Sequence, residues 1–276
     1  MTFVTAVSPS TSARKRFVFG RLLHAEWTKL RTVRSTMWSL VLLVVVVPWL
    51  TFLLTLLISS QWSKSDASSR AQIVADPTST ILGTGVQRGQ LTICVLGVMV
   101  IASEYSTGMI RASLLAVPKR TPMLAAKAVV FAALVFVFGE IVAFPSFFIG
   151  AAILHKHAPV SIGDPGVLRA VIGAGLYLTV LGLFALAVAA IVRHTAGAIT
   201  GVIGFVLVLF PLTKLLPGTV GKHVSAYMPS LAGQLIVHAH QAKDDLLSPW
   251  QGFGVFCVWT ALLLAVAGYL LERRDA

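Results

Sequence analysis

Six long apolar runs dominate this sequence and limit what it can fold into. A helix needs about 20 mostly apolar residues to cross about 30 Å of hydrocarbon, whereas apolar runs in soluble cores are shorter. We therefore predict an all-α integral membrane protein whose transmembrane domain covers residues 37–271. The six predicted spans are residues 37–58, 81–102, 123–151, 167–192, 196–216 and 250–271.

The composition excludes an ordinary soluble domain. Only 12% of the residues are charged and 57% are hydrophobic, whereas soluble domains carry about 25% charged residues. The formal charge of +12 does not indicate nucleic-acid binding, because the basic residues lie at the ends of apolar runs instead of forming one patch. We expect contact with membrane lipid and no nucleic-acid partner. Cys94 and Cys257 both lie within apolar runs and indicate core packing.

The distribution of lysine and arginine predicts the orientation in the membrane. Basic connections are retained in the cytoplasm far more often than they are translocated. The basic residues gather before the first span, between the second and third spans, after the fourth, and at the C-terminus. We therefore predict that both termini are cytoplasmic. The residues concerned are Arg14, Lys15, Arg16, Arg21, Lys29, Arg31, Arg34, Arg111, Lys119, Arg120, Lys127, Arg193, Arg273 and Arg274.

The segment before the first span has the pattern of an amphipathic helix. We predict a disordered basic tail over residues 1–16 and an interfacial helix over 17–36 that continues without a break into the first span. Apolar residues such as Leu22 and Trp27 alternate with bases, which suits the headgroup layer. Glu26 lies among bases that it could pair with at helical spacing. The alternative is a plain positive-inside flank.

The connection between the second and third spans is longer than a chain reversal requires. If the second span continues through Glu104 and Tyr105, Gly108 is a natural helix stop and Pro118 closes a short amphipathic helix at 109–117. Such a helix would lie across the cytoplasmic mouth and offer a docking surface. The alternative is a connection that only reverses the chain.

Three short segments together resemble a known family. They are AEWTKLRTVRST (25–36), SEYSTGMIR (103–111) and AVPKR (116–120). The combination resembles the permease subunits of type 2 ABC exporters, in the form common in actinobacteria. The resemblance implies a connecting helix at 17–36 and a coupling helix within 104–117 that contacts an ATPase.

The same resemblance implies an assembly in a bacterial plasma membrane. Two ABC ATPase subunits and a second permease chain, identical or related, would complete the working unit. A short re-entrant element is implied within Met228–Pro249; from the residues alone, 231–242 is a candidate surface helix on the outer leaflet. We expect residues 272–276 to form a short cytoplasmic tail. The residues expected to dock the ATPase are Glu26, Trp27, Lys29, Arg31, Glu104, Tyr105, Gly108, Arg111, Lys119 and Arg120.

No phosphate-binding loop of the form GxxxxGK[ST] is present, and the nearest string, GTVGKH from Gly218, lacks the spacing. We therefore expect a chain that is not itself an enzyme and holds no cofactor, with ATP and Mg²⁺ bound by the partner ATPase. The His155/His157 and His238/His240 pairs have i, i+2 spacing, which on a helix points the two rings about 200° apart. We expect no metal site.

An acidic residue within the third span is the remaining candidate. Glu140 should face the bundle interior or a watery path, because a charge at the bilayer centre costs about 2.5–3.5 kcal/mol. With Phe144 and Phe205 it could line a translocation path. The alternative is a structural hydrogen bond or ion pair, for instance with Arg88.

We thus predict the permease of an ATP-driven exporter for a hydrophobic or amphiphilic substrate, such as a drug, lipid or peptide. Two other functions stay open at this point: a proton-coupled secondary transporter that uses Glu140, and a membrane scaffold that transports nothing.

Overall fold

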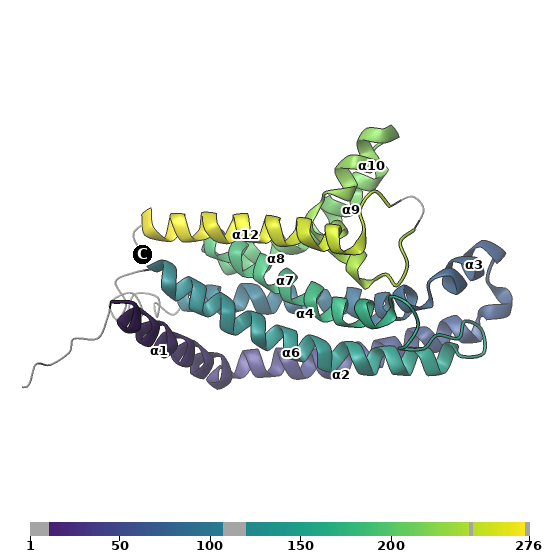
Figure 1. Ribbon diagram of the computed structural model, residues 1–276, viewed down its shortest axis with the longest axis horizontal. Coiled ribbons are helices and arrows are strands. Elements are labelled where there is room, and N and C mark those ends of the chain that lie inside the picture. Colours follow the sequence, from purple (N-terminus) through teal and green to yellow (C-terminus); the bar gives the residue numbers. More distant parts are fainter. Residues whose placement is uncertain (1–10, 107–119, 243–244, 274–276) are drawn as a thin grey trace, which may run out of the picture.

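The computed structural model describes residues 11–106, 120–242 and 245–273, and within these ranges the chain is helical without strands. Among these described residues, six helices are long and apolar enough to cross a membrane, as predicted. Figure 1 shows these helices running side by side. The spans are α2 (Arg34–Ser60), α4 (Pro77–Ser106), α6 (Arg120–Leu154), α7 (Val167–Val192), the fifth span Thr195–Leu212, and α12 (Pro249–Arg273).

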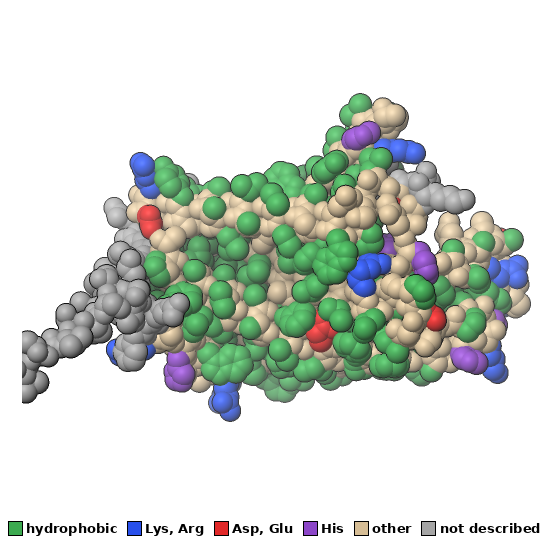
Figure 2. Space-filling view, in the orientation of Figure 1, with side chains coloured by type: hydrophobic (Ala, Val, Ile, Leu, Met, Phe, Trp, Pro, Cys, Tyr) green, Lys and Arg blue, Asp and Glu red, His purple; other side chains and the backbone are tan. Residues whose placement is uncertain are grey.

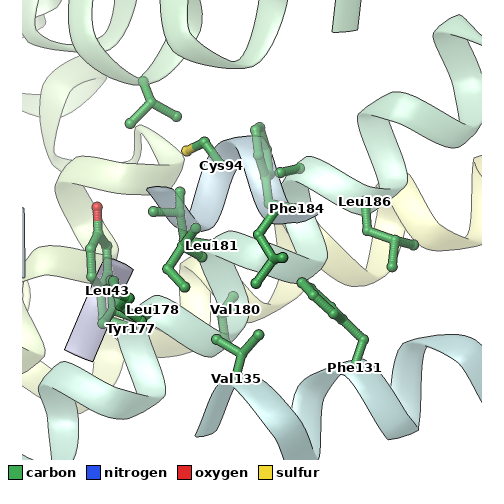
Figure 3. Close-up of a cluster of buried hydrophobic side chains, with 14 of the residues drawn as sticks. Leu43, Cys94, Phe131, Val135, Tyr177, Leu178, Val180, Leu181, Phe184 and Leu186 are labelled. Carbon is green, nitrogen blue, oxygen red and sulfur yellow. The ribbon is translucent and has the colours of Figure 1, made fainter. Parts of the chain in front are cut away.

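The helix α7 is the centre of the bundle. It packs against α4, α6 and α12, and most of its residues are buried. Figure 3 shows side chains of α7 meeting Phe131 and Val135 of α6 and Cys94 of α4. Figure 2 shows apolar side chains over the body of the molecule and most charged groups near its two ends, as expected for a protein with lipid around its middle.

The fifth span is irregular. It comprises α8 (Thr195–Ile203), a π-helical segment η2 (Gly204–Leu209) and α9 (Phe210–Leu212). Pro211 lacks a backbone N–H, so it cannot continue an ordinary helical hydrogen-bond ladder. The span therefore ends at Leu212 instead of the predicted residue 216, and η3 (Thr213–Leu215) follows.

The N-terminal helix is separated from the first span. The helix α1 (Thr11–Thr32) ends before Val33, which has an extended backbone (φ −76°, ψ 109°), and α2 starts at Arg34. The predicted unbroken passage into the first span was wrong. β-Branched valine tolerates extended backbone well, and the break lets α1 run at an angle to α2 (Figure 1) and pack against α6.

Short helices form the connections at the end of the bundle away from α1. The connection between α2 and α4 contains η1 (Trp62–Lys64) and α3 (Ala67–Ala75). The connection before α12 contains α10 (Gly218–Ala226), which projects from the bundle in Figure 1. It then forms α11 (Pro229–Gln234) and η4 (Leu235–Val237).

The segment α11–η4 is buried between α7 and α12, so the surface helix considered for 231–242 was wrong. Glycines make the room for it. A Cβ on Gly173 of α7 would lie 2.6 Å from the carbonyl oxygen of Ile236, and a Cβ on Gly252 of α12 would collide with the carbonyl oxygen of Ala232. The short element can enter the bundle because neither helix presents a side chain at these positions.

Candidate functional site

Four charged side chains from three helices meet at the end of the bundle that carries α1. The ammonium of Lys127, on α6, lies 2.5 Å from Glu26 Oε2 and 2.8 Å from Glu104 Oε1. Lys29 Nζ lies 2.9 Å from Glu26 Oε1 and 3.2 Å from Glu104 Oε1. The cluster therefore joins α1, the last turns of α4 and the start of α6. We call these four residues the ion cluster.

The ion cluster is mostly buried. Lys127, Glu26 and Glu104 are 1%, 3% and 4% exposed, whereas the Lys29 side chain is 30% exposed. Two ammonium groups balance two carboxylates, which is the condition under which buried charges are tolerated. Burial alone would raise the pKa of Glu26, but Lys127 and Lys29 outweigh it and the pKa is lowered. Burial alone would lower the pKa of Lys29, but the two carboxylates raise it.

Local sequence explains how the cluster forms. Glu26 and Lys29 are three residues apart on α1 and so lie on one face of that helix. Glu104 is two residues before the end of α4, and Lys127 lies two turns into α6. The segment 107–119, which joins these two helices, lies outside the described residues.

A comparison with family models matches residues 22–212 to a family described as ABC-2 family transporter protein. The match covers well over half of the chain, including the ion cluster and both helices that flank segment 107–119. The chain belongs to the ABC-2 transporter family. It is therefore a transmembrane component of an ABC transporter, and the family implies a partner that supplies the ATPase. No curated protein matched the permease.

Two of the residues expected to dock the ATPase face inward in the permease. The carboxylates of Glu26 and Glu104 bind lysines of their own chain. Both side chains are buried, so neither is presented at the surface of the described residues. Lys29 is half-buried in the same cluster, whereas Trp27 is 45% exposed and Arg31 is exposed.

The other expected docking residues are described only in part. Tyr105 is half-buried, and the guanidinium of Arg193 lies 5.5 Å from the centre of its ring. Arg120 is the first residue of α6, but its side chain lies outside the described residues. The same is true of the coupling helix predicted at 109–117 and of Gly108, Arg111 and Lys119.

Sequence reasoning missed Lys127. It treated this lysine as one of the bases of a cytoplasmic connection, although it follows four residues into the predicted third span. A lysine within an apolar run is costly to bury unless it has an acidic partner, and that cost could have predicted a buried ion pair. The Thr121 hydroxyl donates to Glu272 Oε1 and so joins α6 to the end of α12. No feature of the sequence predicts that bond.

Glu140 does not pair with Arg88. Arg88 Nη1 donates to the carbonyl oxygens of Gly83 (3.3 Å) and Thr84 (2.9 Å) on its own helix. Within the described ranges, neither carboxyl oxygen of Glu140 has a hydrogen-bond partner, and both are shielded from solvent. The carboxyl group packs against Gly175 of α7, where a Cβ would collide with it. The proposed ion pair was therefore wrong.

The two phenylalanines predicted for the translocation path lie on different spans. Phe144, one turn beyond Glu140 on α6, is half-buried against the core. Phe205 is 44% exposed on the π-helical segment, and its ring stacks on Phe210 with 6.0 Å between the ring centres.

In the described part of the permease, no group of three or more His, Cys, Asp or Glu side chains is arranged to hold a metal ion. The ring of His157 stacks on Trp62 with 4.7 Å between centres. His238 Nδ1 lies 3.6 Å from Asp76 Oδ2.

Proposed function

We propose that the permease forms the translocation path of an exporter for a hydrophobic or amphiphilic substrate. Two ATPase subunits drive it, and a second permease chain, identical or related, completes the path. The ion cluster carries the proposal, because it joins the connecting helix to both helices that enter and leave segment 107–119. The end with the ion cluster faces the cytoplasm of a bacterial cell in this proposal.

The cluster gives segment 107–119 a mechanical connection to the bundle. A movement of that segment acts on the last turn of α4 and the first turn of α6. Glu104 and Lys127 lie close to those ends, and their bonds to Glu26 and Lys29 pass the movement to α1. Separating the charges would leave them buried and unpaired, which is costly. The three helix ends therefore move as one unit when an ATPase docks and closes.

Exposed polar groups on α4 support a path at that helix. Gln87 and Arg88 lie about three turns into the second span, and both are exposed. A charge facing lipid at such a depth would be costly, and intramembrane arginines face cavities or protein. This face of α4 is therefore turned towards a watery path or the second permease chain.

The experiment tests docking and coupling together. The permease would be expressed with the ATPase encoded beside it, purified through a tag on the permease, and assayed in proteoliposomes for ATP hydrolysis. We expect the two proteins to co-purify. The variant Arg111→Glu should lower the permease-dependent ATPase rate at least several-fold, whereas Lys64→Glu in the opposite connection should leave it unchanged.

Absence of the ATPase from the purified complex would contradict the proposal, as would equal rates in the Arg111→Glu and wild-type complexes. The unpartnered carboxyl of Glu140 keeps a proton-coupled mechanism as the second candidate. Flux driven by a pH gradient without ATPase, and lost in Glu140→Gln, would favour that candidate instead.

A further inference from the structure

A small cavity lies between α4, α7 and the buried segment α11–η4, away from the ion cluster. Its volume is about 220 Å³. Gln87 is the lining residue that is exposed as a whole, and we place the opening of the cavity beside it. The residues that matter for its chemistry are Ser79, Gly83, Gln87, Tyr177, Gln234 and His238.

A chain of neutral hydrogen bonds starts at the cavity, where Gln234 and Tyr177 form its inner wall, and continues behind it to Gln90. Gln234 Nε2 donates to the hydroxyl of Tyr177 (3.2 Å), which donates to Gln90 Oε1 (2.8 Å). Tyr177 and Gln90 are 1% and 4% exposed. Figure 3 shows the Tyr177 hydroxyl pointing away from the apolar side chains around its ring. The inner wall is therefore a fixed polar surface inside an apolar bundle.

Two amides remain able to bind a ligand. The bond to Tyr177 uses one N–H of Gln234, and an amide side chain offers a second N–H and a carbonyl oxygen. Gln234 is half-buried at the cavity, and Gln87 is exposed at its opening. Together they provide donors and acceptors of hydrogen bonds without a formal charge.

The cavity has no strong charge of its own. Among the described residues that line it there is no Lys, Arg, Asp or Glu. The nearby charges bind protein groups instead: Asp76 accepts from the Ser79 amide (3.0 Å) and lies beside His238. Arg169 donates to the carbonyl oxygens of His238 (2.9 Å) and Ala239 (2.8 Å). A charged ligand would lose hydration here without gaining a counter-charge.

The size of the cavity limits the ligand further. Pockets for drug-sized molecules have volumes of about 300–1,000 Å³, so this one takes a headgroup rather than a whole drug. A chain attached to that headgroup would leave through the opening beside Gln87, into the membrane or the path along α4.

We propose that this cavity binds the uncharged, hydroxyl- or amide-bearing headgroup of a single-chain amphiphile, with Gln234 and Gln87 as its hydrogen-bonding residues. The proposal rests on the proposed function only for the amphiphilic character of the ligand. Its test needs no ATPase, and the docking test needs no ligand, so failure of one is distinguishable from failure of the other.

The probes are three molecules with the same oleyl-length chain: monooleoyl glycerol, oleylamine and oleyl phosphate. Native mass spectrometry of the full chain in detergent would count the bound molecules and titrate their affinity. We expect one molecule of monooleoyl glycerol per chain, bound at least about tenfold more tightly than either charged probe.

Two glycines supply a matched pair of variants. A Cβ on Gly83 would meet only Gln87 Nε2, at 3.9 Å, so Gly83→Leu should fill the cavity without displacing the backbone. A Cβ on Gly254, on α12, would meet nothing within 4 Å. We expect Gly83→Leu to abolish binding of monooleoyl glycerol and Gly254→Leu to retain it. Gln234→Leu should weaken it about two- to tenfold, and this variant serves if Gly83→Leu does not fold.

Three results would overturn the proposal. One is equal binding of all three probes, which would indicate a non-specific lipid belt. Another is tighter binding of a charged probe that Gly83→Leu abolishes, which would make the ligand class wrong. The third is monooleoyl glycerol binding that is unchanged in folded Gly83→Leu or in Gln234→Leu.

Discussion

At the scale of single residues, Lys127 is the side chain on which the ion cluster depends. It contacts both carboxylates, and its ammonium is almost inaccessible to water. The variant Lys127→Met would keep the apolar stem and leave Glu26 and Glu104 with Lys29 as their one remaining cation among the described residues. Breaking a buried ion pair by removing one partner costs about 3–5 kcal/mol. We expect a large drop in the thermal midpoint of the purified permease in detergent.

Two further variants make this measurement specific. Lys64→Met removes an exposed lysine from the opposite connection and should leave the midpoint nearly unchanged. Lys29→Met should have an intermediate effect, because Lys29 is partly solvated and Lys127 would still hold both carboxylates. Equal midpoints for Lys127→Met and Lys64→Met would show that the cluster does not stabilise the fold.

The lowered pKa of Asp76 predicts that the stability of the fold depends on pH. Burial would raise the pKa of this carboxyl group, but His238 and the Ser79 amide bind the charged form and hold the pKa below its ordinary value of 3.8. A lowered folded pKa means that the carboxylate stabilises the fold above the unfolded pKa, and that this contribution disappears as the pH falls through the folded pKa. The thermal midpoints of wild type and Asp76→Asn should therefore differ at pH 6 and converge below about pH 4.

The exposed Asp66 supplies the control for this pH series, because Asp66→Asn should track wild type throughout. A difference between wild type and Asp76→Asn that grew as the pH fell would contradict the assignment.

At the scale of helical elements, the packing of α11–η4 between α7 and α12 depends on glycines. Gly252 and Gly254 lie two residues apart on α12, but only Gly252 faces the backbone of α11. Gly252→Ala would press a methyl group against the Ala232 carbonyl, and such overpacking costs about 1–3 kcal/mol. Gly254→Ala meets no neighbour and should be neutral, or stabilising by up to about 1 kcal/mol through helix propensity.

Chemical denaturation monitored by tryptophan fluorescence would compare the free energies of unfolding of the two alanine variants. Gly173→Ala would test the same packing from the side of α7. If Gly252→Ala were as stable as Gly254→Ala, the segment would not be held between α7 and α12 as described.

Elements that depend on local pattern could be predicted, and those that depend on tertiary contacts could not. Apolar run length located all six spans, and the prolines at the start of α4 and α12 suit the first turn of a helix. The burial of α11–η4 follows from small residues on two distant helices, which no local pattern shows. The pairing of Glu26 with a neighbouring base was anticipated. Its principal partner is 101 residues away on α6, and no sequence pattern indicates how α1 and α6 align.

At the scale of the whole molecule, the two ends of the bundle differ in chemistry. One end holds the ion cluster, the start of α6 and the end of α12, and the other holds α3, the Asp76–His238 contact and the small cavity. Figure 1 shows α1 and the C-terminal end of α12 at the same end, as an even number of spans requires. The excess of bases near α1 predicts that this end faces the cytoplasm.

Cysteine labelling on intact bacterial cells tests this orientation directly. The background would carry Cys94→Ala and Cys257→Ala, which remove the two native thiols. Thr28→Cys places a thiol on the exposed face of α1, and Ser68→Cys places one on the exposed surface of α3. A membrane-impermeant maleimide should label Ser68→Cys in intact cells and Thr28→Cys only after permeabilisation, because the basic end is retained inside.

The reverse labelling pattern would place the ion cluster outside the cell, where no ATP-driven partner could reach it. Labelling of both sites in intact cells would rule out the six-span arrangement in a sealed membrane.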